Sequence, residues 1–470
     1  MLRQAFHSLL LILLVLLAAA CTRLEPPGPD QPLIVGLPTD PVFQQLSPPT
    51  EGMQGFSRDL VGLFAQSLDV QVKFVTAPDQ PALLEMLQSG QVHMAAAMPE
   101  RQGDRTLLYT STLKSTRQII AQHVDSLPID TPEKLAGREI DVRPGAPQVQ
   151  TLNDLKLTPP PIINENSAVD ELELLEGLAR RRFELVATDE LHFAVAANAN
   201  PDLNIAYELP GKLGYTWAFD PDHASLQAQA QQFIDGVIAN GTLRRLDDRY
   251  FGHIRRLNTR DIQAFLNHIR TRLPEYRHAF HDAQEITGID WRLIAAIAYQ
   301  ESKWDPLATS FTNVRGMMML TGETADRLGV TNRLDARQSI LAGAKYMIIL
   351  MDELPAEIKN PDRLWFALAA YNLGMGHLRG ARSFAPSLNR DPNAWVDMKQ
   401  ILPLMSRPEY YERLKSGRAR GGEAVILVEN IRNYFDVLSR LEPIWTPPSM
   451  ANEKPVAKKP PKKKKSAQRG

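Results

Sequence analysis

The chain has 470 residues, of which 44% are hydrophobic and 23% charged, a composition typical of globular proteins and a length that predicts more than one domain. The formal net charge is −1, but residues 447–470 hold seven Lys and one Arg against one Glu, which leaves −8 for the rest. The basic character is therefore confined to the end of the chain. We expect no nucleic-acid partner. The sequence has one cysteine, so no disulfide forms within the chain.

Residues 1–20 are typical of a signal peptide. Arg3 precedes the apolar run Leu9–Leu17, which is too short for a comfortable permanent membrane anchor, and three alanines follow. Cys21 comes directly after them. This pattern resembles a bacterial lipobox, although lipoproteins usually have Leu three residues before the cysteine. The resemblance implies that Cys21 carries diacylglycerol and, with Thr22 after it, that the protein reaches the outer membrane; signal cleavage nearby with an incidental thiol is the alternative.

Strands and helices alternate after a proline-rich tether at residues 21–31. Apolar runs and period-2 alternation predict strands at 33–37, 70–74, 92–98, 138–143 and 183–188, and helical spacing predicts helices at 55–68, 82–87 and 172–178. Such alternation indicates a parallel α/β sheet. Two sheet-forming halves in succession predict a two-lobed domain with a ligand cleft, which we place at residues 32–257.

Several motifs of this part occur together in a known order: Gly55–Leu60, Pro99–Arg101, Leu135–Gly145, Asn240–Leu243 and Tyr250–Gly252. They resemble the periplasmic solute-binding proteins for polar amino acids. The resemblance implies that Arg101 clamps a ligand α-carboxylate and that Asp189 receives the ligand ammonium. Met98 stands where this family usually has Thr, so one hydroxyl contact is missing. Arg101 could equally be a surface residue in a charged loop. The alternative for the whole region is a degenerate lobe that merely docks on its neighbour.

The alternation stops near residue 257, and residues 258–446 are predicted to form a mainly α domain. Helical patterns cover 262–273, 276–286, 291–302, 322–328, 336–351, 362–372 and 425–438. Residues 447–470 have too few apolar side chains to offset the entropy lost on ordering, so we expect a disordered basic tail.

An acid stands in the apolar stripe of the helix predicted at 291–302. Ile294, Ile297, Ala298 and Glu301 fall at i, i+3, i+4 and i+7. A glutamate in an apolar surface loses hydration of its charged form, so its pKa rises and it can hold a proton for a leaving group at neutral pH. Alternatively, Glu301 is a helix-end residue that points to water. Asp305, the next acid, precedes Pro306, so we expect Asp305 to end the helix.

Three further motifs follow in order: Glu301–Ser310, Val314–Thr321 and Ala369–Gly374. They resemble the lysozyme-like lytic transglycosylases of the soluble-lytic type. The resemblance implies that the substrate is peptidoglycan glycan strands and that Glu301 acts first as acid and then as base, producing 1,6-anhydromuramic acid ends without a cofactor or a metal. It also implies that Ser310 hydrogen-bonds near the glutamate and the sugar, and that Tyr371 and Asn372 hold the saccharide.

Each of these residues has a structural interpretation as well. Ser310 could be a polar loop residue, and Tyr371 with Asn372 a buried aromatic followed by a helix stop. A Met run normally packs a core, so Met318 is at most a pocket wall, and Met319 replaces the Gln usual in the family. Leu427 replaces a usual Tyr near the end of the domain.

Two rival functions remain at this point. One is a lysozyme-type hydrolase on the same fold, and the other is a periplasmic receptor for amino acids or peptides whose helical half is inert. A combined hypothesis is that a muropeptide or amino-acid effector in the N-terminal cleft modulates the enzyme.

Overall fold

The computed structural model describes residues 24–44, 54–100, 106–254 and 257–447. The predicted signal peptide, Cys21, part of the tether, Arg101 and the basic tail lie outside these ranges. The chain divides into two compact units. One contains the residues up to Asn267 together with Met351–Asn433, and the other contains His268–Leu350 together with the residues from Tyr434 on.

A nine-stranded sheet forms the centre of the first unit. Its strands are β1 (Leu33–Pro38), β2 (Val72–Ala77), β3 (Met94–Pro99), β4 (Leu108–Tyr109), β5 (Lys114–His123), β6 (Glu139–Val142), β7 (Ile162–Glu165), β8 (Leu185–Asp189) and β9 (Leu203–Phe219). Their order is β2-β1-β3-β9-β5-β8-β6-β7, with β4 paired to β9. Pairs β1–β2, β1–β3, β6–β7 and β6–β8 are parallel, whereas β3–β9, β4–β9, β5–β8 and β5–β9 are antiparallel. The sheet is therefore mixed, and the prediction of a parallel sheet was wrong for its middle strands.

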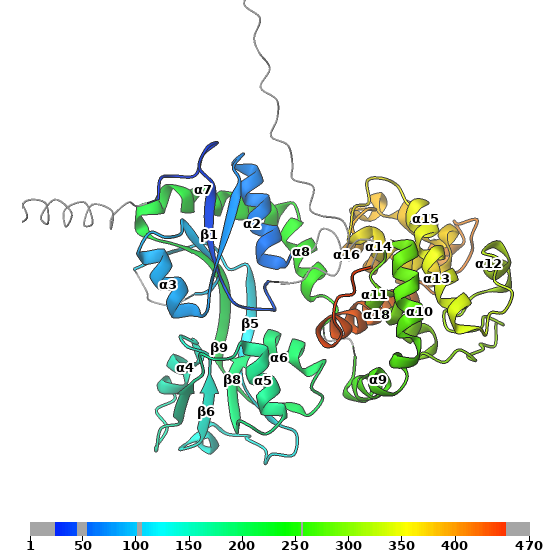
Figure 1. The fold of residues 1–470 in the computed structure, drawn as a ribbon. Helices are drawn as coiled ribbons and strands as arrows, with labels where there is room; N and C mark the ends of the chain where they lie inside the picture. Colours follow the sequence, from blue (N-terminus) through cyan, green and yellow to red (C-terminus); the bar gives the residue numbers. More distant parts are fainter. Residues whose placement is uncertain (1–23, 45–53, 101–105, 255–256, 448–470) are drawn as a thin grey trace, which may run out of the picture. The chain divides into compact units, whose positions relative to one another are not determined.

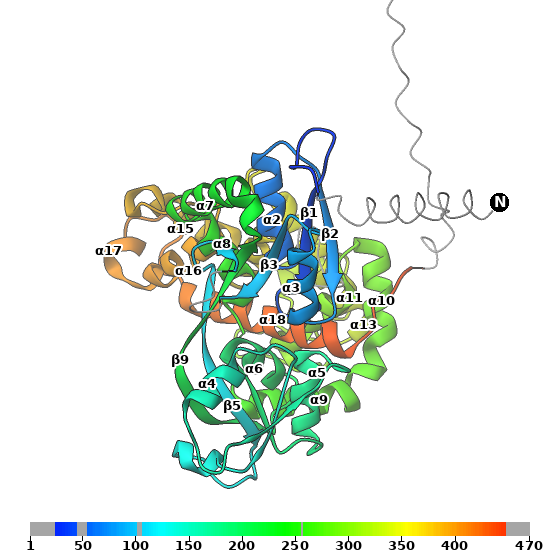
Figure 2. The ribbon, with the colours of Figure 1, turned by 90° about the vertical axis from the view of Figure 1, so that its left-hand side faces the viewer.

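Two long strands, β5 and β9, connect two lobes of this sheet. In Figure 1 and, after a 90° turn, in Figure 2, they run from a lobe around β1 to a lobe around β6. The end of β9 pairs with β3 and β4 in the first lobe, and its beginning pairs with β5 beside β8 in the second. The prediction of a two-lobed α/β domain is confirmed.

Helices cover both lobes and bury separate apolar cores. They are α2 (Phe56–Ser67), α3 (Gln80–Gln88), α4 (Gln148–Asp154), α5 (Glu171–Ala179), α6 (Glu190–Ala197), α7 (Ala224–Ala239) and α8 (Thr242–Phe251). In the first lobe, α2, α7 and α8 share a core with β1 that includes the buried residues Val35, Phe64 and Trp217. In the second lobe, one core gathers around Ile140 and Leu185.

The described chain after residue 257 contains helices and short 3₁₀ turns, as predicted. The α-helices are α9 (Thr259–Thr271), α10 (Leu273–Thr287), α11 (Trp291–Ser302), α12 (Gly322–Arg327), α13 (Ala336–Asp352), α14 (Asp362–Leu373), α15 (Met375–Phe384), α16 (Trp395–Ile401), α17 (Pro408–Tyr411) and α18 (Gly421–Leu441). No helix of the described ranges is long and apolar enough to cross a membrane.

Candidate functional site

Helix α11 carries Glu301 in its last turn. The helix begins after Asp290, whose carboxylate accepts a hydrogen bond from the Arg292 backbone N–H at 2.8 Å. Its residues from Trp291 to Tyr299 are all buried, so the helix is surrounded by protein along most of its length. Glu301 thus lies at the end of a rigid element, which favours a fixed position for its carboxyl group.

The backbone just past Glu301 is held in an uncommon conformation. Lys303 ends the helix with φ 56°, and Trp304 follows with φ 58°. A left-handed backbone is rare for a bulky aromatic residue and persists only where surrounding contacts require it. Here the Trp304 indole N–H donates to the Ala295 carbonyl oxygen at 2.8 Å, and its ring packs edge-on against Tyr299 at 4.7 Å. These contacts fix where α11 stops.

The Glu301 residue is partly accessible to solvent, but its carboxyl group lies among protein atoms. Within the described residues this group makes no hydrogen bond or ion pair. Burial raises the pKa of Glu301 to about 7, and the nearby Lys303 ammonium opposes the rise. Near neutral pH the group is therefore close to half protonated. A carboxyl group in this state can both give and take a proton.

Lys303 is itself held by aromatic neighbours. Its ammonium lies over the rings of Tyr299 and Tyr434, 4.6 and 5.1 Å from their centres, and 3.3 Å from the Tyr434 hydroxyl. It is thus kept beside the end of α11, where it lowers the pKa of Glu301 against the effect of burial.

Asp305 does not end the helix, which stops earlier at Ser302; that prediction was wrong because Lys303 provides the left-handed cap. The exposed Asp305 carboxylate instead accepts a hydrogen bond from the Leu307 backbone N–H at 2.9 Å. It stabilises the start of the following loop.

Ser310 organises that loop. Its hydroxyl lies 2.8 Å from the Thr312 hydroxyl and accepts from the backbone N–H groups of Thr312 and Val314 at 3.2 and 3.3 Å. Phe311, at the loop tip, is 92% exposed. The contacts of the Ser310 side chain in the described chain are therefore internal to the loop, and its predicted contact with the sugar stays a prediction.

The Met run that follows is tied to both α11 and α13. The Ser302 hydroxyl donates to the Met317 carbonyl oxygen at 2.8 Å, and the Met318 backbone N–H donates to the Ser339 hydroxyl at 3.1 Å. The Met318 side chain is fully buried against Gly343, where an added Cβ would come within 2.6–2.8 Å of it. Met318 is thus a packed core residue with contacts on two sides, and its role as a wall of the site stays a prediction.

Gly316 is needed for the turn that opens this run. Its φ is +84°, and a Cβ there would lie 1.8 Å from the Arg333 carbonyl oxygen. Another residue would meet both backbone strain and a backbone clash, so the turn depends on glycine.

Tyr371 and Asn372 end helix α14 in the first unit. The residues before them, Leu364–Ala370, are buried, Tyr371 is half-buried and Asn372 is exposed. The helix stops at Leu373, and Gly374 adopts φ 87°. The pair therefore sits at a helix end, with Asn372 toward solvent, and its saccharide-binding role stays a prediction.

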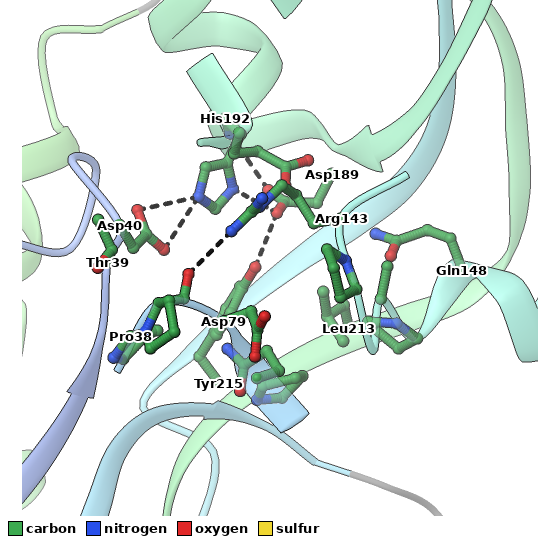
Figure 3. Close-up of a pocket in the computed structure, with 17 residues that line it drawn as sticks. Pro38, Thr39, Asp40, Asp79, Arg143, Gln148, Asp189, His192, Leu213 and Tyr215 are labelled. Atoms are coloured by element: carbon green, nitrogen blue, oxygen red, sulfur yellow. Dashed lines mark hydrogen bonds and ion pairs between the residues drawn. The ribbon is translucent and has the colours of Figure 1, made fainter. Parts of the chain in front are cut away.

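The cleft of the first unit contains Asp189, which caps helix α6. One of its oxygens accepts from the backbone N–H of Leu191 at 2.8 Å and from the Thr116 hydroxyl at 3.2 Å. The other accepts from the Tyr215 hydroxyl at 2.8 Å and lies 2.6 Å from Nδ1 of His192 (Figure 3). Asp189 is thus enclosed by donors from its own protein.

The pocket beside Asp189 is lined by both lobes. Residues that line it include Asp40 and Asp79 from the first lobe, and Arg143 and His192 from the second (Figure 3). Glu171 of the second lobe lines it as well. Burial raises the pKa of Glu171 to about 6, although the His192 imidazolium opposes the rise. The sequence patterns pointed to Asp189 alone among these residues.

Within the described ranges, no group of three or more His, Cys, Asp or Glu side chains is arranged to hold a metal ion.

Two family models match the chain. "Bacterial extracellular solute-binding proteins, family 3" matches residues 33–253, and "Transglycosylase SLT domain" matches residues 278–392. Both resemblances predicted from the motifs are confirmed by these matches.

Curated relatives match nearly the whole length. A protein of Nitrosospira multiformis is 43% identical over 395 residues, which are 83% of this chain and 82% of that protein. One of Thiobacillus denitrificans is 42% identical and covers 93% of this chain and 94% of its own length. One of Methylobacillus flagellatus is 39% identical, with coverages of 93% and 95%. Each is named membrane-bound lytic murein transglycosylase F. This chain belongs to the membrane-bound lytic murein transglycosylase F family.

Two solved structures resemble the first half of this family member. The ligand-binding core of GluR0 from Nostoc punctiforme, in complex with L-glutamate, is 16% identical with a TM-score of 0.41 and covers 47% of this chain and 99% of its own. A mutant of ArgBP from T. maritima is 20% identical with a TM-score of 0.42. It covers 47% of this chain and 95% of its own.

Proposed function

We propose that this chain cleaves the β-1,4 bond between N-acetylmuramic acid and N-acetylglucosamine in peptidoglycan without consuming water. The observation that carries the proposal is Glu301, a carboxyl group among protein atoms with a pKa of about 7 and no carboxylate partner in the described chain. Family membership supplies the substrate class, since the relatives are named lytic murein transglycosylases.

The reaction needs one acid that works twice. Protonated Glu301 gives its proton to the glycosidic oxygen as the bond from C1 to that oxygen breaks, and the substrate's N-acetyl group assists at C1. The Glu301 carboxylate then takes the proton of the C6 hydroxyl, whose oxygen forms the new bond to C1. The product has a 1,6-anhydromuramic acid end, and Glu301 is protonated again.

The other residues have supporting roles in this proposal. Met318 forms a wall of the site, Ser310 shapes the loop beside α11, and Tyr371 with Asn372 bind the saccharide. We retain residues 32–257 and 258–446 as the limits of the non-catalytic and catalytic domains.

Digestion of murein sacculi followed by mass analysis tests the proposal. Anhydro ends are lighter than reducing ends by one water, about 18 Da. We expect anhydro ends with the wild type and a loss of about 10²–10⁴-fold in rate with Glu301→Gln. Asp305→Asn, which removes an exposed carboxylate four residues away, is the matched control and should retain activity.

Reducing ends in the wild-type digest would instead assign a lysozyme-type hydrolase. Full activity of Glu301→Gln would remove Glu301 from the chemistry, and an inactive wild type that binds amino acids would support the receptor.

We also propose that the protein is attached to the periplasmic face of the outer membrane through a lipid on Cys21, after removal of a signal peptide at residues 1–20. The sequence pattern supports this, as does the term "membrane-bound" in the names of the relatives. Labelling of cells with a fatty-acid analogue tests it: Cys21→Ser should abolish the label and release the protein from the membrane fraction.

Finally, we propose that an effector in the cleft near Arg101 and Asp189, a muropeptide or an amino acid, modulates the enzyme. The two-lobed pocket supports this proposal. Calorimetry with murein stem peptides, comparing wild type with Arg101→Ala, measures binding, and lytic assays with the same peptides measure modulation. Unchanged activity with every peptide would contradict it.

A further inference from the structure

His192 of helix α6 lies between carboxylates from both lobes of the cleft. Its Nδ1 is 2.6 Å from Asp189, which ends β8 in the second lobe. Its Nε2 is 3.1 and 3.2 Å from the two carboxylate oxygens of Asp40, which follows β1 in the first lobe (Figure 3). We call this Asp40–His192–Asp189 arrangement the His192 bridge.

The geometry determines the protonation state of the ring. An ionised carboxylate only accepts hydrogen bonds, so both ring nitrogens must carry a hydrogen when each faces one. His192 is then an imidazolium. Burial alone would lower the pKa of His192, but Asp189 and Asp40 more than offset this and hold it well above its ordinary value. The same ring is also close to the buried phenol Tyr215 and to the half-buried acid Glu171.

Asp189 has no acceptor capacity left. Its two oxygens already receive Tyr215, Thr116, the backbone N–H groups that it caps, and His192. A carboxylate offers about four lone-pair sites, and all of them are engaged here. A ligand ammonium could bind Asp189 only by displacing a charge-assisted hydrogen bond from His192.

Two other contacts join the lobes around the same pocket. The Arg143 guanidinium, just after β6, donates to the Pro78 carbonyl oxygen across the cleft at 2.9 Å. Gly145, at φ +74°, packs so closely on Pro81 of helix α3 that a Cβ would lie 2.8 Å from its ring. The lobes therefore meet through the protein's own groups, and of the contacts named here the ion pair is the one between His192 and Asp40.

We propose that His192 takes the place that a ligand ammonium would occupy, so that the His192 bridge holds the lobes together and the cleft excludes ligands with a free α-ammonium group. The bridge thereby determines which class of ligand the cleft accepts. The effector presents a neutral or blocked amino group at the position beside Asp189. This inference narrows the effector proposed above to a muropeptide or another ligand whose amino group is blocked, and argues against a free amino acid. It rests on the proposed regulatory role only for the effect of the ligand on catalysis.

Lobe closure can be measured by pulsed electron paramagnetic resonance on the full chain. Cys21 is the only cysteine, so Cys21→Ser gives a background for spin labels at two exposed helix positions, Gln88 of α3 and Asn153 of α4. We expect a narrow distribution of distances between the two spin labels when His192 is present. His192→Ala should give a broader distribution with a longer mean distance. Added imidazole should restore the narrow distance.

Two variants guard against a folding defect. Asp40→Asn weakens only the cross-lobe half of the bridge and should also lengthen the distance, while leaving the His192–Asp189 contact. His123→Ala removes another buried histidine, on β5, whose neighbour is Asp125 rather than a pocket residue, and should leave the distance unchanged. An unchanged distance in both His192→Ala and Asp40→Asn would overturn the proposal.

Ligand class is tested by calorimetry with L-glutamate and N-acetyl-L-glutamate. Removing the imidazole frees two carboxylates, so His192→Ala should bind L-glutamate at least tenfold more tightly than the protein with His192, with no such gain for the N-acetyl form. Equal binding of L-glutamate by the two proteins would overturn the exclusion.

Lytic assays on the same preparations separate this inference from the proposed function. An active enzyme whose distance between the spin labels is unchanged in both His192→Ala and Asp40→Asn overturns the His192 bridge alone. An inactive wild type with the expected change in distance overturns the enzymatic assignment alone, and a distance change without any change in activity overturns only the regulatory role.

Discussion

Two enclosed carboxyl groups, that of Asp189 in the cleft and that of Glu301 at the end of α11, show how partners decide what an acid can do. Burial alone would raise both pKa values. Asp189 is surrounded by donors, chiefly the His192 imidazolium, which lower its pKa below the ordinary range. Glu301 has no such donor in the described chain, and its pKa rises to about 7. The first is a permanent anion that organises structure, and the second is a group that exchanges its proton.

The largest effect is expected from Asp189→Asn. The amide would turn a donor toward His192 or Tyr215 and leave the imidazolium without its partner, so we expect a loss of about 3–5 kcal/mol in the free energy of unfolding. Denaturant unfolding measures it. Asp125→Asn is the control, because the exposed Asp125–Arg181 pair is worth at most about 1 kcal/mol. Equal stability of Asp189→Asn and wild type would show that Asp189 is not the structural anion that distinguishes it from Glu301.

Glu301→Gln should change stability in a pH-dependent way. Because the pKa of Glu301 is raised in the folded protein, the contribution of Glu301 to the free energy of unfolding is complete below about pH 4.5. This contribution is lost as the pH rises through about 7. The wild type should therefore lose up to about 3 kcal/mol over this interval, while the variant does not. Denaturant unfolding at pH 4.5, 6 and 8 measures the difference. A constant difference across these pH values would contradict the assigned pKa. The contribution of Asp189, whose pKa is lowered, is instead lost only as pH falls below about 3.8.

The rate of glycan cleavage should fall on the alkaline side with an apparent pKa near 7, because Glu301 must be protonated to act as acid. Above that value we expect about a tenfold loss per pH unit. Initial rates on sacculi between pH 5 and 9 provide the profile, and a rate that is flat through pH 8 would show that another group supplies the proton.

Lys303→Met should produce the smallest effect. The Lys303 ammonium lowers the pKa of Glu301. Its removal should therefore shift the alkaline limb of the pH–rate profile to higher pH, by less than about one pH unit. Tyr434→Phe keeps the ring under the ammonium but removes the hydroxyl that contacts it, and should leave the limb in place. A downward shift for Lys303→Met would contradict the electrostatics assigned to Glu301.

Sequence patterns predict the elements whose signal is local. They do not predict features that depend on contacts between residues far apart in the sequence. Runs such as Leu33–Leu37 form a largely buried strand, and the spacing of Ile294, Ile297 and Ala298 already points to an enclosed carboxyl group at Glu301. Strand β9 was missed because Pro210 and Gly211 interrupt it in the way that turns do.

The His192 bridge was also not predicted. His192 and Asp40 are 152 residues apart, so no spacing relates them. The left-handed backbone of Trp304 likewise depends on the Ala295 carbonyl, which a local pattern does not reveal. Only the fold brings such groups together.

The burial of the Met run has a chemical consequence. Met317 and Met318 are fully enclosed, whereas Met319 keeps partial exposure. Conversion of a thioether to its sulfoxide adds a polar oxygen, which is unfavourable at the fully buried side chain of Met318. Oxidation of Met318 would therefore require the packing around it to open first. The rate of Met318 oxidation relative to that of Met319 would report how often this packing opens in the native protein.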